Sequence, residues 1–372
     1  MMSEKIRLGV IFGGRSGEHE VSLMSAKSVL AVLDSQKYEV IQIGIARDGV
    51  WWSGVDVLHS FEKGSTADLY QVAFMPEPGR TILYRRNPKG ESEELSILTC
   101  LDAIFPVLHG TFGEDGTLQG LFELADVAYV GAGVLGSSVG MDKGLFKDVM
   151  CANQIPVVDW IICTRKEIDT KIDEIIVKAE ELAAYPLFVK PANLGSSVGI
   201  SKCKNHSDLV EGILDAARYD RRILIEQGLN AREIEISVLG NENAKVSIPG
   251  EIRPSDEFYS YRAKYIDGKS ELLIPAPLSP ELTKQVQDLA LRVYQAIDCA
   301  GMARIDFLLD KDTNKLFVNE VNTIPGFTSI SMYPKLWEAS GLPYQQLINQ
   351  LIELAVDRKQ ERNKCERTYS RS

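Results

Sequence analysis

A strand, a glycine-rich turn, a helix and a second strand open the chain, and this order limits the folds available to it. Residues 6–12 form a short apolar run of β-forming side chains that ends in the turn Gly13-Gly14-Arg15-Ser16-Gly17. Apolar residues then recur at helical spacing over 21–33, and a further apolar run covers 38–45. This order predicts a βαβ unit, so we expect the N-terminal region to be a doubly wound parallel sheet of the α/β class.

The length and composition predict a multi-domain globular protein. A chain of 372 residues is long for one core and suggests two or three domains of roughly 100–200 residues each. Apolar residues make up 45% and charged residues 25%, which argues against the disordered and membrane classes. The sequence has no window of 18 apolar residues and no signal-peptide pattern, so we expect a cytoplasmic protein with no membrane partner.

Charge, histidine and cysteine content narrow the partners further. The formal net charge of -11, from 41 basic and 52 acidic residues, disfavours a nucleic-acid partner. Only four histidines occur, so we do not expect a histidine-rich metal site. The six cysteines stand singly, without the close pairs of zinc sites or the density of a disulfide scaffold, and are predicted to be buried thiols.

The rest of the chain alternates strands and helices. A strand is expected at 103–107, whereas residues 54–96 carry mixed signals. The pattern restarts after Asp142 with a helix through Cys151, and a later helix is predicted to be capped by Ser207. Further helices are predicted at 171–183, 280–297 and 344–358, with a frayed end past Lys359, a polar loop at 253–269, and strands at 157–163, 187–190, 223–226, 234–239, 245–248, 303–309 and 316–321.

The six-residue sequence Leu-Gly-Ser-Ser-Val-Gly occurs twice, over 135–140 and 194–199. The second copy follows a strand that ends with Lys190, so a lysine stands beside a turn whose backbone NH groups can bind phosphate oxygens. A flexible turn without a ligand is the alternative, because the GxxxxGK[ST] order of a Walker A loop is absent. The first copy is predicted to be structural, and Lys143 just after it is the exception.

Two β-like runs near the C-terminus carry Arg304, Asp306, Glu320 and Asn322. Period-two alternation places the first two on one face of their strand and the last two on one face of theirs. The oxygens of Asp306, Glu320 and Asn322 suit magnesium held between protein and nucleotide phosphates. The alternative is a solvated face on which acidic residues pair with arginines.

The turn after the first strand carries the carboxylates of Glu18 and Glu20. Ligands of open α/β sheets bind at the carboxyl ends of the strands, so a carboxylate here can meet a substrate ammonium group. The alternative is that acidic residues in a first turn complement the helix dipole. The GxGxxG order of a dinucleotide site is missing, which disfavours nicotinamide binding.

Five segments together resemble the D-alanine–D-alanine ligases of the ATP-grasp superfamily, and the resemblance runs from residue 5 to about residue 358. Each segment alone is modest evidence, but their order and separations are specific. The segments are FGGRSGEHEVS at 12–22, LHG and GEDGTLQG within 108–120, MDK at 141–143, VKP and the following loop at 189–199, and NEVNTIPGFT at 319–328.

The resemblance implies a three-domain ATP-grasp ligase, in which two α+β domains sandwich ATP after the N-terminal doubly wound parallel sheet. The implied domains are 1–140 for the N-terminal substrate domain, 141–226 for the central ATP-grasp domain and 227–372 for the C-terminal domain with the metal site. Residues 253–275 would form a mobile lid. Family members are usually homodimers, so we expect a homodimer.

The resemblance also implies which residues bind ATP and magnesium. Two magnesium ions, which manganese can replace, would be held by Asp306, Glu320 and Asn322, and Glu233 would bind the ribose. The remaining cofactor-binding residues would be Lys143 and Lys190 at the phosphates, Glu226, Gln227 and Leu229 at the adenine, and Ser197, Phe258 and Lys264.

The two amino-acid substrates have implied positions as well. Glu18 would bind the ammonium group of the first D-alanine with His109 beside it, and Ser331 would bind the carboxylate of the second. Ordinary loop capping is the alternative for His109 and Ser331. Arg304 and the Gly326 backbone NH would stabilise the tetrahedral oxyanion.

The lid and the second-substrate pocket bear on specificity. Tyr265 would link the lid to Ser196 and Glu18, and closure would keep water from an acyl-phosphate. A core tyrosine is the alternative. In the family resembled, D-lactate ligases lack this tyrosine, and lactate and serine ligases usually carry arginine where this chain has Met332.

The predicted reaction is therefore the ATP-dependent joining of two D-alanines through a D-alanyl-phosphate, which releases ADP and phosphate, for peptidoglycan precursor synthesis. Three alternatives stay open. An ATP-grasp ligase could use D-serine or D-lactate as its second substrate, a nucleotide-binding oxidoreductase could use the opening βαβ unit, and a non-catalytic ATP-binding module would tolerate loss of Arg304 or the metal ligands.

Overall fold

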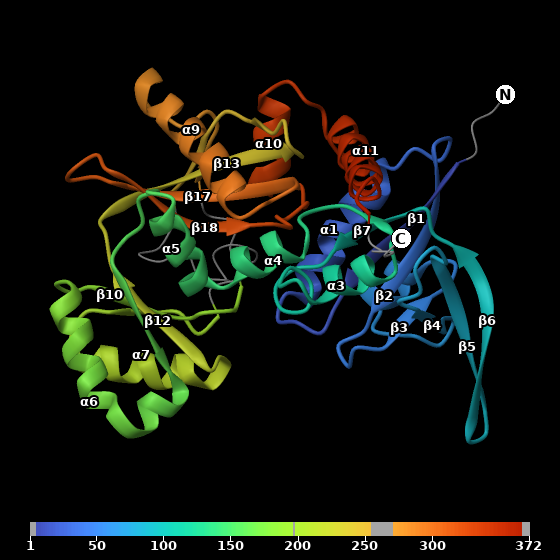
Figure 1. Cartoon of the computed structure of the whole chain (residues 1–372), viewed down its shortest axis with the longest axis horizontal. Helices are drawn as coiled ribbons and strands as arrows, with labels where there is room; N and C mark the ends of the chain where they lie inside the picture. The colour runs from blue at the N-terminus through green and yellow to red at the C-terminus, as the bar shows by residue number, and fades with distance from the viewer. Residues whose placement is uncertain (1–4, 196–197, 254–270, 367–372) are drawn as a thin grey trace, which may run out of the picture.

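The computed structural model of the chain describes residues 5–195, 198–253 and 271–366. Three sheets form its framework, and each comes from a different part of the sequence (Figure 1). Helices cover these sheets, so the predicted α/β class is confirmed. No helix within the described ranges is both long and apolar enough to cross a bilayer.

The N-terminal sheet has eight strands. They are β1 (Ile6–Gly13), β2 (Tyr38–Ile45), β3 (Trp51–Ser53), β4 (Tyr70–Phe74), β5 (Ile82–Lys89), β6 (Ser92–Cys100), β7 (Ala103–Val107) and β8 (Ala128–Tyr129). Their order is β6-β5-β4-β3-β2-β1-β7-β8, and β2, β1, β7 and β8 pair in parallel. The predicted parallel βαβ core is thus confirmed.

The structure adds an antiparallel edge, formed by β3 to β6, to this parallel core. The edge comes from residues 51–100, most of which gave mixed signals in the sequence. Only two residues separate β5 from β6, which is enough for a hairpin but far too few for a parallel crossover. The sheet is therefore mixed.

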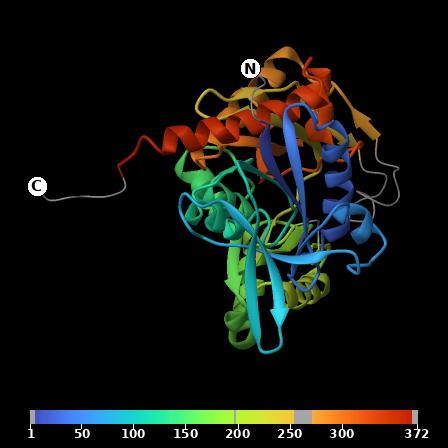
Figure 2. The same cartoon turned by 90° about the vertical axis from the view of Figure 1, so that its right-hand side faces the viewer.

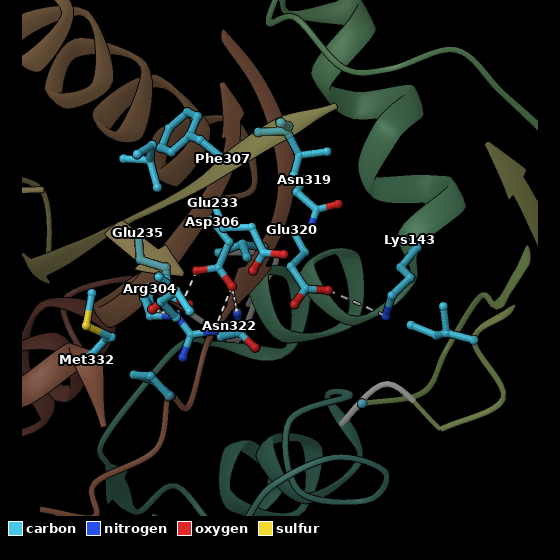
Figure 3. Close-up of a pocket in the computed structure, with 18 of the residues that line it drawn as sticks. Lys143, Glu233, Glu235, Arg304, Asp306, Phe307, Asn319, Glu320, Asn322 and Met332 are labelled. Atoms are coloured by element: carbon cyan, nitrogen blue, oxygen red, sulfur yellow. Dashed lines mark hydrogen bonds and ion pairs between the residues drawn. The ribbon is translucent and has the colours of Figure 1, made fainter. Parts of the chain in front are cut away.

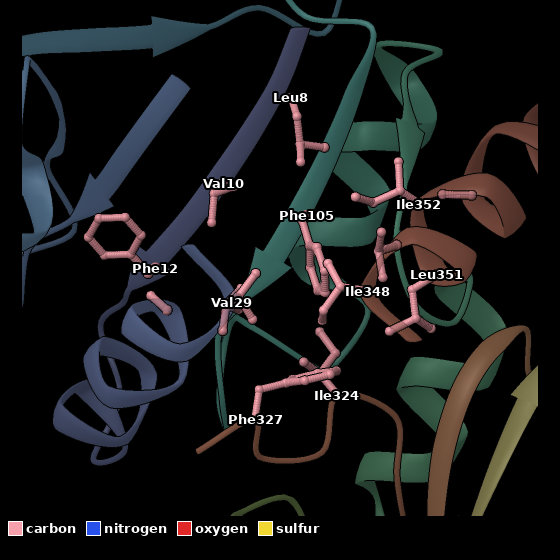
Figure 4. Close-up of a cluster of buried hydrophobic side chains, with 14 of the residues drawn as sticks. Leu8, Val10, Phe12, Val29, Phe105, Ile324, Phe327, Ile348, Leu351 and Ile352 are labelled. Atoms are coloured by element: carbon pink, nitrogen blue, oxygen red, sulfur yellow. The ribbon is translucent and has the colours of Figure 1, made fainter. Parts of the chain in front are cut away.

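Helices cover both faces of the parallel strands, as a doubly wound sheet requires. Side chains of β1 alternate between the faces, with Leu8 on one and Ile11 on the other. The Leu8 face packs against α1 (His19–Val32) and α11 (Tyr344–Arg362), as Figure 4 shows. The Ile11 face packs against α3 (Thr117–Leu124).

The central sheet has four antiparallel strands in the order β11-β10-β12-β9. They are β9 (Trp160–Thr164), β10 (Leu187–Pro191), β11 (Ser201–Cys203) and β12 (Arg222–Gln227), and the helices α6 (Arg165–Leu182) and α7 (His206–Tyr219) cover one face. Leu187 and Val189 face these helices. Alternation along β10 therefore places Phe188 and Lys190 on the opposite face, where both line a cavity.

The C-terminal sheet has six strands, most of them in the order β16-β15-β13-β17-β18 with β14 beside β13. They are β13 (Ala231–Gly240), β14 (Lys245–Val246), β15 (Gly250–Arg253), β16 (Glu271–Leu273), β17 (Gly301–Asp310) and β18 (Leu316–Asn322). Apolar residues such as Ile234 and Ile305 face α5 (Lys143–Ala152) and α9 (Pro280–Ala296) in one core. Polar residues of the same strands face the other way.

Two helices of the central region begin where a side chain caps them. The predicted Ser207 cap is wrong, because Asn205 accepts the hydrogen bond from the NH of Asp208 and α7 starts at His206. The helix predicted at 171–183 begins earlier, since Thr164 and Glu167 form a capping box at its N-terminus.

The C-terminal helix α11 packs on the N-terminal sheet as well as on β13 and β17 of the C-terminal sheet (Figures 1 and 2). It continues past the predicted fraying point at Lys359 to Arg362, whose guanidinium forms ion pairs with Glu123 and Asp126. The C-terminal end of the described chain thus contacts the N-terminal region. The boundaries predicted at 140 and 226 stay a proposal.

The repeated hexapeptide adopts two different structures. The first copy lies inside the helix α4 (Val134–Met141), whereas the described residues of the second copy, up to Gly195 and from residue 198, form a loop. Asp142 caps the following helix α5 by accepting hydrogen bonds from the NH groups of Gly144 and Leu145. The first copy is thus helical, and its predicted structural role stays a prediction.

Candidate active site

A cavity of about 1220 Å³ is lined by residues of the central and C-terminal sheets and by Glu18, His109 and Glu114, which follow strands of the N-terminal sheet. Figure 3 shows its polar wall. Every predicted site residue within the described ranges lines this one cavity: Glu18, His109, Lys143, Lys190, Glu226, Gln227, Leu229, Glu233, Arg304, Asp306, Glu320, Asn322, Gly326 and Ser331. The predicted site residues Ser196, Ser197, Phe258, Lys264 and Tyr265 lie outside the described residues.

Three carboxylates form a row across the C-terminal sheet. Asp306 of β17 pairs with Glu235 of β13 on one side and with Glu320 of β18 on the other. Like charges that lie directly opposite each other on neighbouring strands destabilise a sheet unless cations compensate them. The row of carboxylates therefore requires cationic groups beside it at this wall of the cavity.

Arg304 supplies part of that charge. Its guanidinium donates hydrogen bonds to both Asp306 oxygens, at 2.7 and 2.6 Å, and its Nε lies 2.9 Å from Glu235 Oε2. Burial by itself would lower the pKa of Arg304, but the charges of Asp306 and Glu235 raise it well above its ordinary value. Arg304 is thus a fixed cation at the cavity wall.

Lys143 compensates the other end of the row. Its Nζ lies 3.9 Å from Glu320 Oε2 and donates a 2.8 Å hydrogen bond to the carbonyl of Leu194. That carbonyl belongs to the loop behind Lys190. The predicted glycine-serine loop and the predicted oxygen-bearing strands therefore face each other across one cavity.

The chemistry of the donor set fits a hard divalent cation. Asp306, Glu320 and Asn322 present only oxygen ligands beside one another, and the Asn322 amide donates to Asp306 Oδ2 at 3.0 Å. Within the described part of the chain, no group of three or more His, Cys, Asp or Glu side chains could hold a metal by itself. Two carboxylates and one amide suit a metal that also takes phosphate oxygens from a nucleotide.

Across the cavity from the carboxylate row lies the buried carboxylate Glu226, which has two lysine partners. Glu226 is 2% exposed and forms ion pairs with Lys190 and with Lys147, the latter at 3.0 Å. Burial favours the neutral form of Glu226, but the two ammonium groups outweigh it and lower the pKa of Glu226 to about 2. Glu226 is thus ionised and holds Lys190 at the cavity.

Glu18 projects into the cavity between two glycines. A Cβ atom at Gly110 would lie 2.4 Å from Glu18 Oε2, and one at Gly195 would lie 2.5 Å from the same oxygen. Gly110 also has a φ of +74°, which disfavours other residues. These glycines allow the loops after β7 and β10 to approach a carboxylate from the end of β1.

The loop that contains Gly326 is held by side chains of the N-terminal region. His109 Nδ1 contacts the Ile324 carbonyl at 3.0 Å, and Ser25 Oγ accepts a hydrogen bond from the Phe327 NH at 3.2 Å. Ser25 Oγ also lies 3.0 Å from His109 Nε2. A carbonyl only accepts, so Nδ1 carries the proton and Nε2 accepts from Ser25. Burial, which lowers the pKa of His109, favours this neutral ring.

Glu114 is the third buried side chain that bonds to the loop containing Gly326. Its carboxyl accepts hydrogen bonds from the NH groups of Gly110 and Ile324, at 2.7 and 3.3 Å. Burial raises the pKa of Glu114 to about 8, with the charge of Glu18 adding to the effect. Three buried side chains thus fix the backbone on both sides of Gly326.

Ser331 precedes α10 (Met332–Ala339) and lines the cavity. Its hydroxyl accepts a hydrogen bond from the Thr328 NH at 3.1 Å and bonds the Thr328 hydroxyl at 2.8 Å. A Cβ at Gly326 would lie 2.7 Å from this hydroxyl. The Ser331 hydroxyl thus bonds within its own loop, and its role in substrate binding stays a prediction.

The sequence interpretation missed Lys147, Glu235, Ser25 and Glu114. Each had a weak signal. Lys147 follows Lys143 by four residues on one helix, and Glu235 follows Glu233 by two residues on one strand, so each pair shares a face. Ser25 and Glu114 lie near or within segments that carry the family resemblance, but only the fold shows that they meet the Gly326 loop.

Comparison with known families identifies the chain. The family model described as D-ala D-ala ligase N-terminus matches residues 7–132, and the one described as D-ala D-ala ligase C-terminus matches residues 149–353. A D-alanine–D-alanine ligase of Natranaerobius thermophilus is 48% identical over 370 residues, which are 99% of this chain and 100% of that protein.

The chain belongs to the D-alanine–D-alanine ligase family. Solved structures of similar proteins agree with this membership. A D-alanine–D-alanine ligase from Coxiella burnetii has a TM-score of 0.81 and 38% identity, and covers 97% of each chain. The VanG D-Ala:D-Ser ligase from Enterococcus faecalis has a TM-score of 0.82 and 34% identity, and covers 95% of this chain and 100% of that one. The predicted ATP-grasp ligase fold is confirmed.

Proposed function

We propose that the chain joins two D-alanines to D-alanyl-D-alanine with ATP, releasing ADP and phosphate, for peptidoglycan precursor synthesis in the cytoplasm. A homodimer is the proposed assembly. One observation carries the proposal. Lys190 with the start of the loop behind it, the carboxylate row at Asp306, the Glu18 carboxylate and the Gly326 loop all border the same cavity.

The nucleotide would occupy the side of the cavity between the central and C-terminal sheets. Lys143 and Lys190 are the cations available to its phosphates, while the wall near Gln227 and Leu229 is the proposed adenine site. Glu233 of β13 would take the ribose hydroxyls. Asp306, Glu320 and Asn322 would hold two magnesium ions, which neutralise phosphate charge and polarise the transferred group when bound.

The first step transfers the γ-phosphoryl group to the carboxylate of the first D-alanine, which gives an acyl-phosphate and ADP. Glu18 would hold the ammonium group of this substrate, because a buried carboxylate between two loops is a matched partner for it. His109 is neutral and packs beside this position. It therefore adds no competing positive charge.

The second step is attack by the amine of the second D-alanine on the acyl carbon, after which phosphate leaves. Arg304 and the Gly326 NH would stabilise the oxyanion, and the loss of one such donor typically costs roughly 10²- to 10³-fold in rate. Ser331 would bind the carboxylate of the second substrate. Tyr265 and Lys264 on the proposed lid, and Ser196, to which Tyr265 would link, lie outside the described residues and keep their proposed roles in excluding water.

D-serine is the second candidate for the second substrate. The similar VanG protein is a D-Ala:D-Ser ligase, and its structure covers 95% of this chain. Met332, which lines the cavity next to Ser331, favours D-alanine because an apolar side chain offers no hydrogen bond to the D-serine hydroxyl.

The deciding experiment measures ADP release with magnesium and ATP against D-alanine, D-serine, D-lactate and L-alanine. We expect turnover when D-alanine is the only amino acid present, and mass spectrometry should identify the product as D-alanyl-D-alanine. Faster turnover of D-alanine mixed with D-serine, with the mixed dipeptide as main product, would favour the second candidate. Absence of ADP release with every amino acid would overturn the ligase proposal.

A further inference from the structure

Lys147 is a lysine that the proposed reaction leaves without a role. It lies on α5, is 1% exposed and does not line the cavity. Its Nζ is 3.0 Å from Glu226 Oε2 and 5.6 Å from the centre of the Trp160 ring. Lysines are rarely this deeply buried, because removing an ammonium group from water is costly unless a partner compensates it.

Glu226 has two lysines on its two oxygens. Lys190 pairs with Oε1 from the cavity side, and Lys147 pairs with Oε2 from the protein side. Two positive charges thus share one negative charge. A single lysine would suffice to neutralise Glu226, so the second cation is in excess for structure alone.

The second positive charge beside Glu226 becomes important when Lys190 moves from Glu226 to another partner. In the proposed function Lys190 contacts nucleotide phosphates, so its ammonium group must weaken its ion pair with Glu226. If Glu226 had no other partner, a buried carboxylate would be left uncompensated, and that penalty would oppose nucleotide binding. Lys147 remains on Oε2 throughout, with the Trp160 ring beside it.

We propose that Lys147 is a positioning residue that keeps Glu226 compensated, so that Lys190 can transfer to the phosphates of the nucleotide. This inference rests on the proposed nucleotide site. It predicts that Lys147 contributes much more to the affinity for Mg-ADP, whose phosphates it does not touch, than to the affinity for adenosine, although Glu226 itself lines the cavity beside the proposed adenine site. A residue with a purely structural role would affect both ligands alike.

The test compares Lys147→Met with the wild-type protein by calorimetric titration of Mg-ADP and of adenosine. Methionine keeps the length and burial of the side chain but removes its charge. We expect the Kd of Mg-ADP to rise by roughly 10- to 100-fold, in the range of ordinary coupling between sites, and the Kd of adenosine to rise by a much smaller factor. Lys147→Arg keeps the charge and should restore most of the Mg-ADP affinity.

Lys147→Gln, which keeps a hydrogen-bond donor, is the second variant if methionine prevents folding, and the same pattern is expected. Thermal unfolding of each variant checks that it is folded. Unchanged Mg-ADP affinity, or equal losses for Mg-ADP and adenosine, would overturn the role of Lys147. Failure of the wild-type protein to bind Mg-ADP would instead overturn the nucleotide site itself, so the two failures are distinguishable.

Discussion

Both carboxylate oxygens of Asp306 accept hydrogen bonds from Arg304, at 2.7 and 2.6 Å, two positions away on the same strand. The proposed metal ligand and the proposed oxyanion donor are therefore partners of each other. Magnesium at the proposed site would compete with Arg304 for Asp306. Glu235, 2.9 Å from the Nε of Arg304, is then the carboxylate that remains to orient the guanidinium.

Glu235→Gln should raise the magnesium concentration needed for half-maximal activity by several-fold. The neutral amide holds Arg304 less strongly, so Arg304 stays closer to Asp306 and competes better with the metal. The measurement is a magnesium titration of ADP release at fixed ATP. Glu251→Gln is a matched control, because Glu251 is also buried and pairs with Arg232. A magnesium requirement that shifts equally in both variants would remove this assignment.

Glu320→Ala should lose turnover while the protein remains folded. Metal ligation contributes several kcal/mol of transition-state stabilisation, so a loss of at least ~10²-fold is expected. Steady-state ADP release measures the loss, and circular dichroism checks the fold. Asp312→Ala, an exposed carboxylate in the turn between β17 and β18, is the control. Normal turnover in Glu320→Ala would contradict the metal site.

Ser25→Ala should slow catalysis without weakening ATP binding. The change leaves the Phe327 NH and His109 Nε2 unpaired, which costs about 1–3 kcal/mol of unfolding free energy, and it loosens the loop around Gly326. We expect kcat to fall by roughly 10-fold with little change in the KM for ATP. Ser28→Ala, one turn later on α1, should leave kcat unchanged. Equal effects of the two substitutions would rule out the anchoring role.

The free energy of unfolding of Glu114→Gln, compared with that of the wild-type protein, should increase as the pH rises. Burial first, and then the charge of Glu18, raise the pKa of Glu114 from 4.5 to about 8 in the folded state. The protonated carboxyl therefore favours folding fully below pH 4.5, and this contribution is lost as the pH rises through 8. Glutamine does not titrate. Denaturant unfolding of both proteins without added ligand, between about pH 5 and 8, measures the difference, and parallel profiles would contradict the raised pKa.

Much of the fold could be predicted because its signals are local. The first strand, turn and helix follow from apolar spacing and glycines near Gly13. The strand at 103–107 also follows, since a continuous apolar run begins directly after Asp102. Residues 51–100 escaped prediction because exposed edge strands such as β6 lack an alternating apolar pattern.

The sequence by itself determined the reaction class and most of the polar residues around the cavity. Motif order and period-two alternation are properties of the chain, so spacing alone places Asp306, Glu320 and Asn322 on polar strand faces. Only the tertiary structure decided which groups share a charge or a backbone anchor. Lys147 meets Glu226, and Ser25 meets the Gly326 loop, through contacts between segments far apart in sequence. Such contacts depend on how helices and sheets pack, which local spacing does not encode.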